Sequence, residues 1–250
     1  MTRARELGDA PPPYGTVVFD CDSTLAAIEG IEELARGNEE VARLTRAAME
    51  GRIALEQVFG RRLELVRPTR ADVERIGALY VDSILPNAAR LVAALQALGK
   101  RVCIVSGGLL PAVLVLARAL AIPEEDVHAV DLRFDAAGGY AGFDERSPLA
   151  RASGKLTVLE ALRRPGEALA FVGDGATDLE AAPAAERFIA FGGVERRARV
   201  LAAARVRCLE PDFRSLVPHL FTREEIASLA RSPAHRALLE VPSGVTPPTA

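Results

Sequence analysis

Two aspartates one residue apart, Asp20 and Asp22, are the residues of this sequence whose type and spacing first suggest chemistry. They follow the run 17–19, Val-Val-Phe, which predicts a short buried strand. Because side chains alternate along a strand, we expect Asp20 and Asp22 to point the same way at its carboxyl end and Cys21 to face the other side. Two carboxylates so close together favour a metal ion that offsets their charge. An ordinary turn built from Asp and Ser is the alternative interpretation.

Polar residues also follow two later strand-like runs, at the point where each run ends. They are Ser106, Gly107 and Gly108 after the run 101–105, and Gly173, Asp174, Thr177 and Asp178 after the run 168–172. Glycines let a backbone approach an anion closely, although Ser-Gly-Gly alone also fits a plain tight turn. The carboxyl ends of parallel strands share one edge of a sheet, and open α/β sheets bind their ligands there. We therefore expect all three groups of polar residues to converge at that edge.

Lys155 is one of only two lysines in the chain, against 29 arginines. It follows Gly154 at the start of an expected helix over 154–163, where a positive charge opposes the helix dipole. Helix stability therefore does not explain the residue. A compact ammonium that neutralises a phosphoryl or carboxylate oxygen does explain it.

Taken together, these motifs resemble those of the haloacid dehalogenase-like phosphotransferases. In chain order they are Asp20-x-Asp22-x-Thr24, Ser106, Lys155 and Gly173-Asp174-Gly175-Ala-Thr-Asp178. Within that superfamily, residues from about 14 to 218 are similar to the phosphoserine phosphatases. The stretches that carry this similarity include Glu29-Gly-Ile-Glu-Glu-Leu-Ala, Val105-Ser-Gly-Gly, Tyr140-Ala-Gly-Phe-Asp-Glu and Phe188-Ile-Ala-Phe-Gly-Gly.

The resemblance implies an Mg²⁺-dependent phosphomonoester hydrolase that works through an aspartyl-phosphate. Asp20 would be the nucleophile, and Asp22 would first protonate the leaving oxygen and later take a proton from water. The carboxylates of Asp20 and Asp174 and the backbone carbonyl of Asp22 would bind Mg²⁺. The phosphoryl oxygens would be held by Ser106, Gly107, Gly108, Thr177 and Lys155. Asp178 would orient the acidic cluster without touching the substrate.

The resemblance also implies that the substrate is O-phospho-L-serine and that the enzyme acts in serine biosynthesis. Glu29 would bind the ammonium of the amino acid, Arg62 its carboxylate, and Met49 would line the pocket. Glu29 also fits an acid at a helix start, and Arg62, beside Arg61, also fits a solvated helix face. Leu55 departs from the family, which usually has phenylalanine against the substrate, so the pocket is expected to be looser.

The arrangement of apolar residues predicts the fold that must position these groups. Strand and helix alternate from residue 101 onward, which is typical of a doubly wound, mostly parallel α/β sheet, the Rossmann-type core of haloacid dehalogenase-like proteins. Four helical stretches without a strand between them predict an inserted helical-bundle cap, in which Thr69 and Asp72 form a capping box. Runs at 127–134 and 140–143 predict a small β-hairpin. The expected parts are a flexible tail at 1–13, a catalytic core at 14–27 and 86–221, a helical cap at 28–85, and a C-terminal helical extension with a disordered tail at 222–250.

Composition narrows the class of partner. The 31 basic and 34 acidic residues give a net charge of −3, which argues against a nucleic-acid or membrane-surface protein. No apolar stretch is long enough to cross a membrane. Three cysteines, Cys21, Cys103 and Cys208, lie in strand-like runs without metal-ligand spacing, as expected for buried, reduced thiols in the cytoplasm. We expect a small-molecule substrate and allow for a homodimer.

Two other functions stay open on the sequence alone. The aspartyl-phosphate could be passed to another hydroxyl group, which would make the protein a phosphotransferase, or the pocket could accept a different small phosphomonoester. A catalytically silent phosphate-binding or interaction protein is disfavoured, because every group that the chemistry needs is present.

Overall fold

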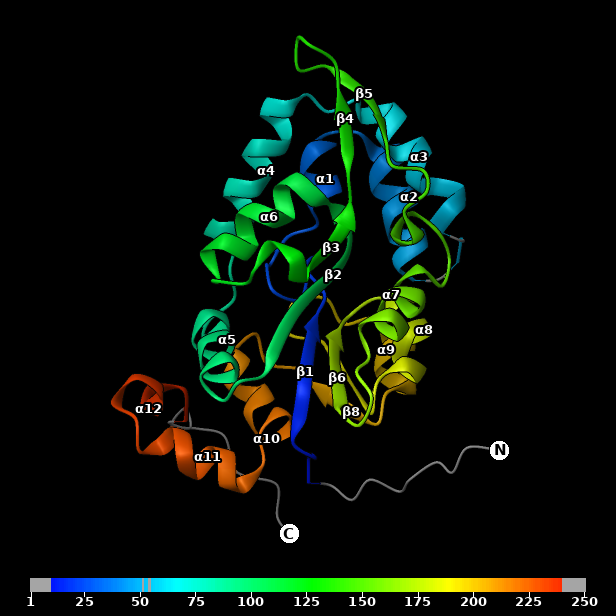
Figure 1. Ribbon diagram of the computed structural model, residues 1–250. Helices are drawn as coiled ribbons and strands as arrows, with labels where there is room; N and C mark the ends of the chain where they lie inside the picture. The colour runs from blue at the N-terminus through cyan, green and yellow to red at the C-terminus, as the bar shows by residue number, and fades with distance from the viewer. Residues whose placement is uncertain (1–9, 51, 54, 240–250) are drawn as a thin grey trace.

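A six-stranded parallel sheet forms the centre of the molecule, in the order β3-β2-β1-β6-β7-β8 (Figure 1). This computed structural model describes residues 10–50, 52–53 and 55–239, without the side chains of Met49, Leu55 and Glu56. The strands are β1 (Tyr14–Phe19), β2 (Arg101–Leu109), β3 (Val127–Val130), β6 (Ala168–Gly173), β7 (Arg187–Phe191) and β8 (Val206–Cys208). In the central strand β1, Val17, Val18 and Phe19 are fully buried, as is typical of a parallel strand covered on both faces.

Helices cover both faces of this sheet, with α5 and α6 on one side and α7, α8 and α9 on the other (Figure 1). Their bounds are α5 (Ala88–Ala97), α6 (Leu110–Ala119), α7 (Gly154–Leu162), α8 (Ala176–Ala181) and α9 (Ala198–Ala203). Short 3₁₀ helices occupy Glu124–Asp126, Pro148–Ala150, Ala182–Ala184 and Phe213–Leu216. The predicted fold class, a doubly wound α/β sheet, is confirmed.

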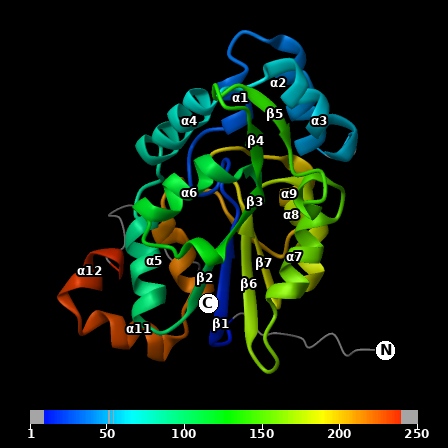
Figure 2. The same ribbon diagram turned by 45° about the horizontal axis from the view of Figure 1, so that its top comes forward.

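Four helices between β1 and α5 lie beyond the carboxyl ends of the strands (Figures 1 and 2). They are α1 (Gly30–Leu34), α2 (Glu39–Met49), α3 (Leu55–Val66) and α4 (Arg70–Asp82). The capping box predicted at the start of α4 is confirmed: the Asp72 N–H donates to Thr69 Oγ1 over 3.2 Å, and the Thr69 N–H donates to Asp72 Oδ2 over 3.0 Å. These helices thus face the sheet edge where the polar motifs end.

The predicted β-hairpin is only half right. Its first arm, expected over 127–134, divides into two strands: β3 pairs in parallel with β2, and β4 (Leu132–Phe134) pairs antiparallel with β5 (Tyr140–Phe143). Asp131 lies at the break, where its side chain accepts a hydrogen bond from the Leu132 N–H. β2 is likewise longer than the predicted 101–105, because Leu109 still pairs with Val130 after a register shift. The Ser-Gly-Gly run is therefore part of β2 and not a turn that follows it.

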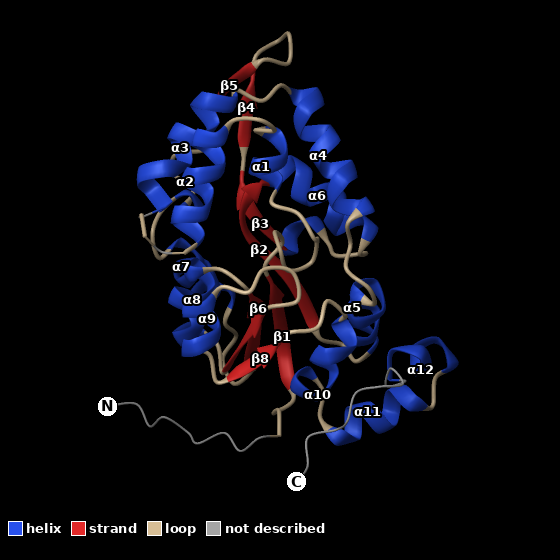
Figure 3. Ribbon diagram, turned by 180° about the vertical axis from the view of Figure 1, so that it is seen from behind, coloured by secondary structure: helices blue, strands red, loops and turns tan. Residues whose placement is uncertain are grey.

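The C-terminal helices pack at the opposite end of the molecule, next to α5 (Figure 3). They are α10 (Val217–Leu220), α11 (Arg223–Ala230) and α12 (Pro233–Leu239). A buried lysine ties them to the sheet: Lys100 Nζ lies 2.6 Å from Glu225 Oε1 and donates to the Tyr14 carbonyl over 2.8 Å. The three cysteines are buried and free, and none of the helices in the described ranges is long and apolar enough to cross a membrane.

Candidate active site

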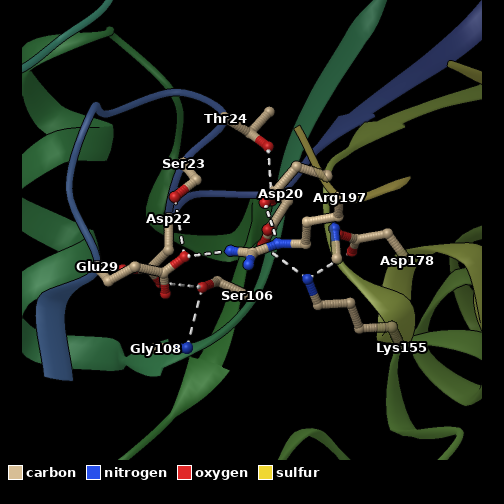
Figure 4. A network of polar contacts seen from close by, with 12 residues as sticks. Asp20, Asp22, Ser23, Thr24, Glu29, Ser106, Gly108, Lys155, Asp178 and Arg197 are labelled. Carbon is tan, nitrogen blue, oxygen red and sulfur yellow. Dashed lines mark hydrogen bonds and ion pairs between the residues drawn. The ribbon is translucent and has the colours of Figure 1, made fainter. Parts of the chain in front are cut away.

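Asp20 and Lys155 form an ion pair at the carboxyl end of the central strand (Figure 4). Asp20 follows β1 and is 1% exposed, and Lys155 lies in the first turn of α7. Lys155 Nζ donates to Asp20 Oδ1 over 2.7 Å and to Asp178 Oδ1 over 2.5 Å. Burial lowers the pKa of Lys155, but Asp178 and Asp20 outweigh it and raise that pKa above its ordinary value. One fixed ammonium therefore serves two buried carboxylates.

Three carboxylates at this point could hold a metal ion. Oxygens of Asp20, Asp174 and Asp178 lie within 4.8 Å of one another, and all three residues are buried. Burial raises the pKa of Asp20, and the neighbouring Asp178 raises it further; burial also raises the pKa of Asp174 to about 7. Burial and the neighbouring carboxylate charges thus disfavour the ionised forms, and a divalent cation would offset this.

The contacts within this cluster indicate which carboxylate oxygens are open to a ligand. Both oxygens of Asp178 are engaged, by Lys155 and by the Gly175 N–H at 2.8 Å. Asp20 Oδ2, in contrast, is buried without a hydrogen-bond partner among the described residues. Asp174 Oδ2 accepts a hydrogen bond from Arg197, whereas its Oδ1 has a long contact of 3.4 Å with Thr24 Oγ1. Carboxylate oxygens are the ligands that Mg²⁺ prefers, so the residues present fit an Mg²⁺ ion held by Asp174 together with Asp20.

Asp22 is held by donors from two directions. Its Oδ1 accepts hydrogen bonds from the Gly30 N–H and from the Tyr80 hydroxyl, each over 2.7 Å. Its Oδ2 lies 3.4 Å from Ser106 Oγ, which in turn accepts the Gly108 N–H over 2.9 Å. Burial and the Asp22 carboxylate raise the pKa of Tyr80, so its hydroxyl keeps its proton and donates it. Asp22 is thus fixed with one oxygen bound firmly and the other more weakly.

A pocket lies between these groups and the helices α1 to α4. Its lining combines Asp20, Asp22, Gly107, Gly108, Lys155 and Thr177 from the sheet side with Glu29, Ile31, Ala48, Arg62 and Tyr80 from the other side, and Leu109 at the end of β2. Eight of these twelve residues are sites that the sequence predicts. Ser106, Asp174 and Asp178 lie behind this lining, bonded to residues of the site. Met49 is predicted to line the pocket, but its side chain lies outside the described part of the structure.

Glu29 and Arg62, which are predicted to bind the amino-acid part of the substrate, have different surroundings. Glu29 Oε1 accepts hydrogen bonds from Ser23 Oγ and from Arg197 Nη2, each over 2.8 Å. Burial, followed by the charge of Asp22, raises the pKa of Glu29. Arg62, among the residues that the structure describes, donates to a neutral group, Thr45 Oγ1, over 3.2 Å.

The guanidinium of Arg62 is also unusually short of partners for a buried cation. Its Nε is buried and unpartnered within the described residues, and burial lowers its pKa to about 10. The face of the Phe59 ring lies 5.6 Å from the guanidinium carbon, and the nearby charges of Glu29, Asp22 and Glu32 also favour the cation, without outweighing burial. Arg62 is therefore a buried cation with an unused donor in the pocket wall.

Sequence reasoning missed two polar residues of this site, Tyr80 and Arg197. Arg197 Nε donates to Asp174 Oδ2 over 2.8 Å, and the same side chain binds Glu29, so it links the acidic cluster to the wall of the pocket. In the sequence it is one of several arginines at 196–199, and nothing there distinguishes it. Tyr80 fits the apolar spacing of the helix 69–84, so its pattern predicts a core residue.

The family of the chain follows from comparison with known proteins. A haloacid dehalogenase-like hydrolase model matches residues 14–186, and the chain belongs to that family. It is 41% identical over 182 residues to the phosphoserine phosphatase of Bos taurus, across 71% of this chain and 81% of the relative. Identity is 36% over 208 residues to the chloroplastic phosphoserine phosphatase of Arabidopsis thaliana, across 80% of this chain and 70% of the relative.

A solved structure gives the same family. The phospho-aspartyl intermediate analogue of phosphoserine phosphatase superposes with a TM-score of 0.71 at 26% identity, over 84% of this chain and all of that one. The predicted resemblance to the phosphoserine phosphatases and the predicted class of enzyme, a phosphatase, are both confirmed.

Proposed function

We propose that this phosphatase hydrolyses O-phospho-L-serine to serine and phosphate, with Mg²⁺, through an aspartyl-phosphate on Asp20. One observation carries the proposal: Asp20 reaches the pocket with one oxygen held by Lys155 and the other free of described partners. A carboxylate that served only to stabilise the fold would be expected to have both oxygens satisfied. A nucleophile needs one oxygen oriented and one available.

In the first step, the Asp20 carboxylate attacks phosphorus as the bond from phosphorus to the serine oxygen breaks. Asp22 gives its proton to that oxygen, so serine leaves as a neutral alcohol. Lys155 stays between Asp20 and Asp178 and neutralises charge beside the transferring group. Bound by Asp20, Asp174 and the Asp22 carbonyl, Mg²⁺ would supply the positive charge that lets an anionic nucleophile meet an anionic ester.

In the second step, water attacks the phosphorus and the bond to Asp20 breaks. Asp22, now a carboxylate, takes the proton of that water, which restores both residues for another turnover. Gly107 and Thr177, both in the pocket lining, are suited to hold phosphoryl oxygens through a backbone N–H and a hydroxyl. We assign Ser106 and Gly108 a supporting role, because the Gly108 N–H is bound to Ser106 Oγ.

The choice of substrate follows from the pair Glu29 and Arg62. Arg62 has an Nε without a partner in the described part of the chain, which suits the carboxylate of an amino acid. Ser23 and Arg197 both bind Oε1 of Glu29, and a substrate ammonium can use the other oxygen. Opposite charges on one pocket wall match a zwitterion better than they match a sugar phosphate. The curated relatives, named as phosphoserine phosphatases, support the same substrate.

A phosphate-release screen tests this proposal. Phosphoserine, phosphothreonine and sugar phosphates are each supplied with Mg²⁺ and, separately, with a chelator. We expect the highest kcat/KM for phosphoserine and loss of turnover with the chelator. Preference for a sugar phosphate, or full activity without the metal, would contradict the proposed substrate or the proposed cofactor respectively.

Three wider expectations go with the proposed function. The core at 14–27 and 86–221 would carry the chemistry and the cap at 28–85 the recognition of the amino acid. The enzyme would supply serine in the cytoplasm. It would act alone or as a homodimer, which measurement of its mass in solution decides.

A further inference from the structure

Tyr80 contacts the reacting part of the site from a helix that the motifs do not include. It lies in the last turns of α4 and is 1% exposed. Its hydroxyl donates to Asp22 Oδ1 over 2.7 Å, and the Gly30 N–H donates to the same oxygen. The two donors together leave Asp22 Oδ2 as the oxygen that faces Ser106 and Gly108.

The space around this hydroxyl is closely fitted. A Cβ atom at position 30 would lie 2.2 Å from the Tyr80 hydroxyl oxygen. A Cβ at position 108 would lie 3.0 Å from Asp22 Oδ2 and 3.4 Å from the same hydroxyl. Glycine at both positions therefore permits the close approach of Tyr80 to Asp22.

The other two tyrosines of the chain show that burial alone does not produce such a contact. Tyr14 and Tyr140 are 2% and 6% exposed, and their hydroxyls have no hydrogen-bond partner in the part of the chain that the structure describes. All three residues are buried. Only the Tyr80 hydroxyl binds a carboxylate in the pocket, so its oxygen does more than complete a packed core.

We propose that Tyr80 is a positioning residue for the acid–base work of Asp22. Together with the Gly30 N–H, the Tyr80 hydroxyl fixes Asp22 Oδ1 and leaves Asp22 Oδ2 to exchange the proton. Oδ2 gives the proton to the serine oxygen as the ester bond breaks. It takes a proton from water as the phosphoryl bond to Asp20 breaks. This inference rests on the proposed role of Asp22, but it does not depend on which alkyl phosphate the pocket accepts.

Comparison of two leaving groups tests the inference. Serine is a poor leaving group and needs a proton as it departs, whereas p-nitrophenolate departs without one. Since kcat/KM covers the steps up to departure of the leaving group, Tyr80→Phe should lower it about 10- to 100-fold for phosphoserine. The same variant should change kcat/KM for p-nitrophenyl phosphate less than about twofold, because the role of Asp22 as acid is not needed in that step. KM for phosphoserine should stay within about twofold, because Tyr80 acts through Asp22 and not on the amino acid.

Tyr140→Phe is the matched control, since it also removes one buried hydroxyl. It should leave kcat/KM for both esters unchanged, and thermal unfolding of both variants shows that they are folded. Equal losses on the two esters, or no loss on phosphoserine, would overturn the role of Tyr80. If the parent enzyme hydrolyses another alkyl phosphate in place of phosphoserine, the proposed substrate fails, and that alkyl phosphate decides the role of Tyr80 in the same comparison.

Discussion

The two ends of the pocket hold their charges in different ways. At the sheet edge, Lys155 lies between Asp20 and Asp178, and ionic or backbone donors hold Asp178 on both oxygens. At the end formed by α1 to α3, Arg62 has a neutral hydroxyl and an aromatic ring as its contacts, and one of its nitrogens has no partner among the described residues.

On the proposed function, this difference would separate chemistry from recognition. The sheet edge would be organised before the substrate arrives and would cost little to reorganise during the reaction. The guanidinium at the other end would gain its missing contact only from a ligand that supplies a carboxylate, so its binding energy would favour an amino-acid substrate. Changes at the two ends should therefore have different kinetic effects.

The largest effect is expected from Asp20→Asn at the sheet edge. An amide of nearly the same shape is a far weaker nucleophile, so phosphate release should fall on the order of 10⁴-fold or more for every phosphomonoester. Steady-state phosphate release with phosphoserine and with p-nitrophenyl phosphate measures this. The variant should stay folded and unfold as cooperatively as the parent. Turnover near the parent rate would contradict the covalent mechanism.

A smaller and substrate-specific effect is expected from Arg62→Ala at the other end. Loss of a buried charged contact to the substrate carboxylate should weaken capture of phosphoserine by about 2–5 kcal/mol, seen mainly as a higher KM. Turnover of p-nitrophenyl phosphate, which has no amino-acid carboxylate, should change little. Arg61→Ala is the matched control, because the Arg61 side chain is 60% exposed and pairs with Glu40. Equal effects of the two variants would remove Arg62 from the site.

The smallest expected effect is a pH dependence of the stabilisation that Mg²⁺ gives to the folded protein. Burial raises the pKa of Asp174 from 3.8 to about 7, so the metal-free folded protein binds a proton that the unfolded chain has lost. Stability without metal should therefore fall as pH rises from about 4 to about 7. Because Mg²⁺ replaces that proton, it should raise the Tm more at pH 8 than at pH 5.

Thermal unfolding with Mg²⁺ and with a chelator measures this difference. Asp174→Asn should show a weaker dependence, since an amide neither titrates in this range nor carries the charge that attracts the ion, while Asp20, whose pKa is also raised, remains. A shift in Tm that is equal at both pH values would contradict the assignment of Asp174 as a ligand.

Local chemistry determined how much of the fold could be predicted from the sequence. The run 17–19, the capping box of Thr69 and Asp72 and the alternation after residue 101 are short-range patterns, and the structure agrees with them. The break at Asp131 could not be seen, because the choice between an edge strand and a hairpin arm depends on β2, which is distant in the sequence. The extension of β2 through Ser106 depends on the same pairing.

The residues of the site likewise divide into those that the sequence predicts and those that depend on tertiary packing. Asp20, Lys155 and Asp178 meet because strand ends converge at one edge, and that rule can be applied to a sequence. Tyr80 and Arg197 reach the site through the packing of α4 and of the segment before α9, which depends on the whole tertiary structure. Their residue types alone, a tyrosine in an amphipathic helix and an arginine among arginines, give no signal.

The central claim is that Asp20 carries the phosphoryl group during turnover. Rapid acid quenching of the enzyme with phosphoserine and Mg²⁺, followed by peptide mass spectrometry, tests it most directly. A phosphoryl group on the peptide that contains Asp20, labile to base and absent from Asp20→Asn, is the predicted result. Turnover without any phosphorylated peptide, or with the phosphoryl group on another residue, would contradict the account.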